Sequence, residues 1–178
     1  MTVSTCHCGE GKLMVVGTLK DERFQEFHAL AGEVLPGGII HHLTIRLLMN
    51  AASLLIEDVS VEMKTVPEEA CLETCHCLDA LKGLTITKGF TVKAKKLAGG
   101  KQGCTHLMEL LLVMAPAAFQ GRIAYRGRVP INLDAQRIRG VIDVLVDTCH
   151  AWREDGPIIK KIKAFLNKKS NRERRASA

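Results

Sequence analysis

Four runs of residues with high β propensity occupy the first third of the chain, and short turn-forming segments join them. The runs are residues 13–19, 24–34, 39–48 and 54–64. Connections this short join antiparallel neighbours, because a parallel crossover needs about a dozen residues or more. In the last run Val59, Val61 and Met63 alternate with polar side chains, as in a sheet with one buried and one solvated face. The sequence therefore predicts an antiparallel meander of three or four strands.

The pattern becomes helical after residue 64. Thr65-Val66-Pro67-Glu68 fits a capping box, and we expect a helix from there to Gly83. Residues 90–98 suit a short helix or a strand, and we favour a helix that ends at the following two glycines. Further helices are expected from residue 104, over residues 135–152 and from residue 158. The chain is thus assigned to the α+β class, with a three- or four-stranded antiparallel meander packed against helices.

The basic charge of the chain is concentrated at its C-terminal end. The formal net charge is +6, and residues 157–178 hold eight Lys/Arg and one acid, which leaves −1 for the rest. We therefore expect a flexible N-terminus over residues 1–12, a single α+β domain over 13–156, and a basic C-terminal helix and tail over 157–178. Such a tail is either a solvated end or a contact for anionic partners. The few aromatic residues argue against nucleic acid as a specific ligand.

Seven cysteines are many for 178 residues. Their odd number and the lack of a secretion signal argue against a disulfide framework, so we expect reduced thiols or metal ligands. No segment is expected to span a membrane, and the expected location is the cytoplasm.

The segment from Gly99 to Leu110, GGKQGCTHLMEL, has the strongest chemical character. It delivers Cys104 and His106 to the start of an apolar helix, where unpaired N–H groups and the helix dipole favour a thiolate. Glu109 follows His106 by three residues and can orient its ring by accepting a hydrogen bond. Three interpretations stay open for Cys104: packing or capping, a metal or cluster ligand, and a nucleophile.

Two more residues complete a candidate metal site. Cys71 is expected in the first turn after the meander, the same loop-to-helix setting as Cys104, and His41 begins a strand. Together with Cys104 and His106 they offer two sulfurs and two nitrogens, a donor set for zinc or iron. Cys6-His7-Cys8 and Cys75-His76-Cys77 lack C-x-x-C spacing, and we interpret them as chance or as mobile thiols.

The chain resembles a bacterial family catalogued as domain of unknown function 2889, over roughly residues 13–121. The resemblance lies in Gly38-Ile39-Ile40-His41, Pro67 with Cys71, Leu81-Lys82-Gly83-Leu84-Thr85-Ile86, Gly89-Phe90 and the whole of the segment from Gly99 to Leu110. Membership of this family implies no activity.

A more remote similarity is to iron–sulfur scaffold proteins of the U type. It places Cys71 at their first cysteine, Lys82-Gly83 at their turn and Cys104 at their last cysteine. The middle cysteine and the aspartate beside the first one have no counterpart here. The resemblance implies a scaffold-like fold, and an iron–sulfur cluster as a third cofactor beside zinc and iron.

The leading hypothesis is a metal- or iron–sulfur-handling protein that is not a conventional enzyme. Its ligands are Cys71, Cys104, His106 and His41, and Glu109 orients His106. The first alternative is a non-catalytic interaction or small-ligand-binding module in which the same residues are packing. The second is a thiol enzyme with Cys104 as nucleophile and a histidine as base.

Overall fold

The computed structural model describes residues 1–128 and 135–176, without the side chains of 135–137, 144 and 170–176. The chain divides into two compact units, Met1–Val129 and Pro130–Ala178, and each is described here by itself. This division differs from the expected single domain over 13–156 with a separate tail, since the second unit also takes in residues 130–156.

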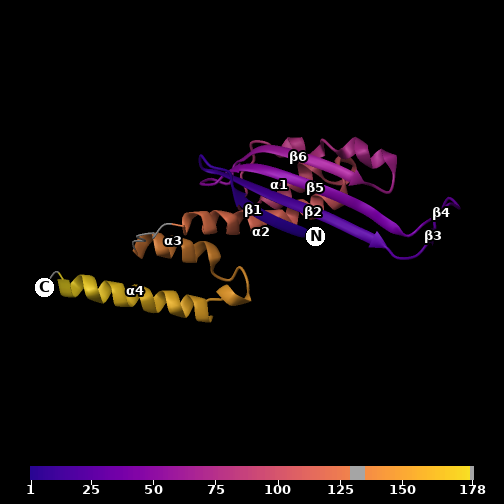
Figure 1. Ribbon diagram of the computed structural model, residues 1–178. Coiled ribbons are helices and arrows are strands. Elements are labelled where there is room, and N and C mark those ends of the chain that lie inside the picture. Colours follow the sequence, from indigo (N-terminus) through magenta and orange to yellow (C-terminus); the bar gives the residue numbers. More distant parts are fainter. Residues whose placement is uncertain (129–134, 177–178) are drawn as a thin grey trace. The chain divides into compact units, whose positions relative to one another are not determined.

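The first unit is built on a four-stranded antiparallel sheet, so the α+β assignment is confirmed. Its strand order is β1-β2-β5-β6, formed by Thr2–His7, Lys12–Arg23, Gly38–Asn50 and Ile56–Thr65. Two expectations about the strands were wrong. Residues 1–12, expected to be flexible, contribute the edge strand β1. The run 24–34 does not enter the sheet, and forms with Leu35 the small hairpin of β3 (Phe27–His28) and β4 (Val34–Leu35), which projects beyond the sheet (Figure 1).

One face of the sheet carries the core. Every second residue of β5 from His41 to Met49 is buried, and the intervening residues are more exposed. Helix α2 (Thr105–Arg126) lies against the buried face (Figure 1), and α1 (Phe90–Ala98) packs on α2 and contributes Phe90, Ala94 and Ala98 to the same core. Gly17 of β2 permits the close approach of α2, because a β-carbon there would lie 2.5 Å from Sδ of Met114. Among the described residues of this unit, no helix lies over the opposite face of the sheet (Figure 1).

Helix α2 begins where the sequence predicts, with Cys104 as its N-cap residue, and continues through Pro116 to Arg126. By length and composition α2 is apolar enough to cross a membrane, which the sequence interpretation did not anticipate, and 44% of its apolar window is buried inside the protein. The core helix of a soluble protein has the same properties, and this helix packs on the sheet.

The helix expected between the capping box and Gly83 is absent from this described part of the chain. Two 3-10 helices stand there, η1 (Glu69–Thr74) and η2 (Cys77–Leu81). Thr65 is still in β6 and Glu68 is extended, with φ of −136° and ψ of 141°, so the box cannot close. A further 3-10 turn, η3 (Gly100–Gln102), precedes Cys104.

The second unit is helical. It contains α3 (Ala135–Leu145), the 3-10 turn η4 (His150–Trp152) and α4 (Pro157–Ala176). The helix expected over 135–152 ends at Leu145, and Asp147 adopts a positive φ of 58° just beyond it. The expected basic helix corresponds to α4, although the side chains from Ser170 onward lie outside the described residues.

Candidate metal centre

Three residues that are distant in the sequence meet at one edge of the core. Asp21 lies near the end of β2, His41 near the start of β5 and His106 in the first turn of α2. One candidate ligand atom from each lies within 4.8 Å of the other two. The sheet register places Asp21 opposite His41, and the pairing shifts by a bulge immediately after Asp21. Such bulges often re-aim side chains beside functional sites.

Asp21 holds His41 through both its backbone and its ring. The backbone N–H of His41 donates to Oδ1 of Asp21 at 2.7 Å. Nδ1 of the ring lies 3.0 Å from each carboxylate oxygen. At this separation the carboxylate and Nδ1 can share a hydrogen bond, and they can also bind one ion together, because two ligand atoms about 2.1 Å from the same metal lie roughly 3.0–3.4 Å apart. Desolvation raises the pKa of Asp21, but the hydrogen bonds and charge of His41 outweigh this effect, so the pKa is lowered overall.

His106 faces His41 from the helix. The centroids of the two rings are 3.8 Å apart and the rings are tilted by 36°. Burial lowers the pKa of His106 and the neighbouring His41 lowers it further, whereas Asp21 acts in the opposite direction. His106 is therefore neutral at lower pH than an ordinary histidine, and the neutral imidazole is the form that binds a metal ion.

Cys104 lies beside this group. Its Sγ is 3.9 Å from Nδ1 of His106, and its side chain makes no capping hydrogen bond to α2. Its thiol neighbour is Cys77 of η2. Burial is the main reason that the pKa of Cys77 is raised, and a hydrogen bond from the backbone N–H of Cys104 opposes that effect. Cys104 can thus supply a sulfur close to the imidazole of His106.

Two of the sequence-predicted site residues stand apart from this group. Cys71 lies within η1, and its carbonyl oxygen accepts a hydrogen bond from the Thr74 hydroxyl at 2.7 Å. Among the described residues, no hydrogen bond links the Cys71 thiol to His41, Cys104 or His106. Glu109 is exposed, and within the same part of the chain it forms no hydrogen bond with His106. The ring of His106 turns toward His41, whereas Glu109 faces solvent.

Sequence reasoning did not identify Asp21. The segment Lys20-Asp21-Glu22 reads as a turn, whereas β2 continues through it to Arg23. If β2 is extended through this segment, Asp21 pairs with His41 across the sheet, and the carboxylate and the imidazole come together. The missing information was the register of two long strands.

Residues 1–120 match the model of a family described as "Protein of unknown function (DUF2889)". The chain belongs to this family. Asp21, His41, Cys104 and His106 all lie in the matched region, which DUF2889 membership leaves without an assigned activity. No curated protein and no solved structure matches the chain. None of these findings supports the resemblance to U-type iron–sulfur scaffolds.

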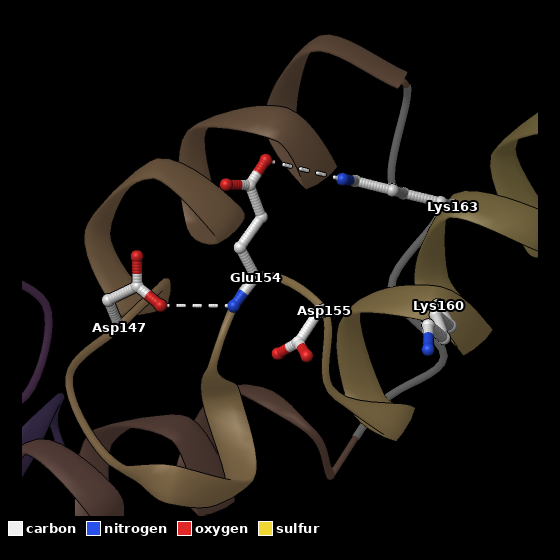
Figure 2. Close-up of a pocket in the computed structure, with 5 residues that line it drawn as sticks. All are labelled: Asp147, Glu154, Asp155, Lys160 and Lys163. Carbon is white, nitrogen blue, oxygen red and sulfur yellow. Dashed lines mark hydrogen bonds and ion pairs between the residues drawn. The ribbon is translucent and has the colours of Figure 1, made fainter.

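A hollow of different character occurs in the second unit. Figure 2 shows its lining residues, which enclose about 540 Å³: Asp147, Glu154, Asp155, Lys160 and Lys163. The backbone N–H of Glu154 donates to Asp147 at 3.0 Å, and the Glu154 carboxylate pairs with Lys163 at 3.7 Å (Figure 2). The Glu154 carboxylate is thus neutralised by Lys163, and that of Asp155 pairs with Arg153 at 3.2 Å. The Asp21–His41–His106 group is the better candidate site, because its donor atoms converge.

Proposed function

We propose that this protein binds a divalent transition-metal ion through Asp21, His41 and His106. The observation that carries the proposal is the convergence of one carboxylate and two imidazoles, from three elements, to within 4.8 Å. A cluster drawn from β2, β5 and α2 is held by the fold, since the sheet register and the helix start fix all three side chains. Such a cluster differs from exposed acidic groups that meet by chance.

The donor set favours zinc or iron(II). Imidazole suits zinc, copper, iron and nickel, and two histidines with one carboxylate leave coordination positions open on iron(II) or zinc. Magnesium and calcium prefer oxygen ligands alone. An iron–sulfur cluster needs several thiolates, whereas among the described residues one cysteine, Cys104, contacts a histidine of the group, His106. The sequence led us to expect zinc, iron or an iron–sulfur cluster, and of these the proposal keeps zinc and iron.

His42 provides a matched control. It follows His41 in β5 but points to the other face of the sheet, because side chains alternate along a strand. A chelator first removes any metal from the protein, and Zn²⁺, or Fe²⁺ in the absence of oxygen, is then added. Elemental analysis and calorimetry measure the bound metal. Wild type and His42→Ala are expected to retain about one ion per chain. His41→Ala and His106→Ala are expected to lose it, and Asp21→Ala to bind at least roughly 100-fold more weakly, since the loss of a group that only hydrogen-bonds to a ligand already costs roughly 10–100-fold.

Far-UV circular dichroism and urea unfolding show whether each variant remains folded. The proposal fails if folded wild type binds neither ion, or if His42→Ala loses as much metal as His41→Ala. Failure would favour the interaction or small-ligand-binding module, in which these histidines are packing. The proposed location is the cytoplasm, and the seven free cysteines are compatible with its reducing conditions.

Cobalt(II) can test whether Cys104 is a further ligand. A thiolate bound to cobalt gives a charge-transfer absorption that imidazole and carboxylate do not give. We expect this band in wild type and its loss in Cys104→Ser, with the ion still bound through the other three residues. A spectrum unchanged by Cys104→Ser would remove the sulfur from the ligand set and leave the proposal itself intact.

One observation favours a second candidate, thiol chemistry at Cys104: its Sγ lies 3.9 Å from Nδ1 of His106. A nucleophile activated by this histidine should react quickly with iodoacetamide in chelator-treated protein, and His106→Ala should slow the reaction. Equal rates in wild type and His106→Ala would exclude the activated nucleophile.

A further inference from the structure

Cys6 and Cys8 form a pair of thiols at the end of β1, in a part of the chain separate from the Asp21–His41–His106 group. Their Sγ atoms are 3.9 Å apart, and both residues are exposed. Residues two apart in an extended strand point to the same side, which explains why C-x-C spacing places the two sulfurs together here. The structure thus gives this motif an ordered geometry, in contrast to the mobile thiols expected from the sequence.

The intervening residue fixes the direction of the pair. The His7 ring stacks on Tyr125 of α2, with centroids 4.2 Å apart and an angle of 10° between the rings. Because His7 faces the helix, Cys6 faces the uncovered side of the sheet. The turn after β1 is closed by two backbone hydrogen bonds, Cys8 N–H to Lys12 O at 3.1 Å and Lys12 N–H to Gly9 O at 2.8 Å. The backbone that carries the two thiols is therefore fixed by the turn.

A third sulfur lies across the strand pair. Met14 of β2 is the register partner of Cys6. Directly opposite residues of an antiparallel pair share a face, with β-carbons about 4.5–5.5 Å apart. The Met14 thioether therefore belongs to the same open face as the two thiols, within the reach of a long side chain.

We propose that Cys6, Cys8 and Met14 form a binding site for a soft monovalent metal ion, copper(I). Thiolate and thioether ligands select copper(I) over harder ions, whereas the nitrogen and oxygen donors of Asp21, His41 and His106 suit zinc or iron(II). Binding releases one proton from each thiol and forms three copper–sulfur bonds, two to the thiolates and one to the Met14 thioether. The ion is supplied and held as copper(I), so no electron is transferred.

The affinity test uses the full-length protein without oxygen, in the presence of a phosphine reductant. Copper(I) is titrated in competition with a chromogenic chelator such as bicinchoninate. Cys6→Ser and Cys8→Ser are each expected to weaken binding by at least roughly 100-fold, since losses of outer groups alone reach that range. Met14→Leu should cause a smaller loss, roughly tenfold. The control is Cys149→Ser, which removes an exposed thiol of the second unit and should leave the affinity unchanged.

Alkylation followed by mass spectrometry assigns the site. One equivalent of copper(I) should slow the modification of Cys6 and Cys8 and leave Cys149 unaffected. His41→Ala should retain copper(I) binding, which separates this proposal from that of the zinc or iron(II) site. The proposal is overturned if Cys6→Ser and Cys8→Ser bind copper(I) as tightly as wild type, or if the protected thiols are Cys77 and Cys104 instead.

Discussion

At the scale of single residues, Gly103 determines how closely the segment before α2 approaches the end of α1. A β-carbon on Gly103 would overlap the backbone carbonyl oxygen of Ala98 and lie 3.1 Å from Sγ of Cys77. The backbone of Gly103 is extended, with φ of −165°, so any residue could adopt its conformation. Space, not backbone freedom, requires glycine here, and the position of Cys104 depends on it.

We therefore predict that Gly103→Ala lowers the free energy of unfolding by roughly 2 kcal/mol or more, within the upper part of the usual range for single substitutions. Gly17→Ala is the comparison. Its β-carbon would meet the side chain of Met114, which can adopt another rotamer, so the expected loss is about 1 kcal/mol. Urea unfolding measures both changes. A Gly103→Ala protein that is as stable as Gly17→Ala would contradict the argument.

The candidate metal centre could be predicted from the sequence only in part, for reasons visible at single residues. Cys104 and His106 follow from the glycine-rich segment, because a helix start is encoded locally. His41 was also identified, but its partner Asp21 was not, since their pairing depends on strand register across 20 residues of chain. Cys71 was chosen because it was expected to lie in the same loop-to-helix setting as Cys104, whereas the thiol that neighbours Cys104 is that of Cys77.

At the scale of elements, those with a regular pattern of buried residues could be predicted from the sequence, whereas those placed by tertiary contacts could not. Helix α2 and the β5–β6 pair follow from periodicity, because their buried faces repeat regularly. Strand β1 did not, since its place depends on contacts with α2 such as the His7–Tyr125 stack. The run 24–34 was wrongly assigned to the sheet, because it has a local β pattern without the tertiary contacts of a sheet strand. Its apolar residues Phe24 and Leu30 are exposed rather than packed in the sheet.

Pro116 lowers the stability of helix α2. The residue lies inside the helix and is exposed, and proline there cannot donate the hydrogen bond to the carbonyl of Leu112. We predict that Pro116→Ala raises the free energy of unfolding by about 1 kcal/mol, a part of the proline cost in helix interiors because the native helix has adjusted to it. Thermal and urea unfolding should show the increase.

Gln120→Ala serves as the control for this prediction. Gln120 is exposed on the same helix one turn later, and the change adds no backbone hydrogen bond, so we expect a shift within about 0.5 kcal/mol. A lower stability of Pro116→Ala would indicate that the packing of α2 on the sheet depends on the proline.

At the scale of the whole molecule, the core and both proposed sites belong to one unit. The buried apolar cluster extends from Leu13 to Ala118, and the family match ends at residue 120. In the described part of the second unit, the buried apolar side chains are Ile138 and Ile159. The second unit has 49 residues and the first 129. Burial on folding increases with chain length, so the two units should differ greatly in independent stability.

We predict that residues 1–129 fold alone and bind zinc as tightly as we propose for the full chain, whereas residues 130–178 show no cooperative unfolding. The reason is that Asp21, His41, His106 and the surrounding core remain intact in the longer fragment. Urea unfolding of each fragment and zinc calorimetry of residues 1–129 provide the measurements. An unfolded 1–129 fragment would show that the second unit is needed to complete its core. A folded 1–129 fragment with weakened zinc binding would instead show that the second unit contributes to the site. Either result would contradict the assignment of fold and function to the first unit.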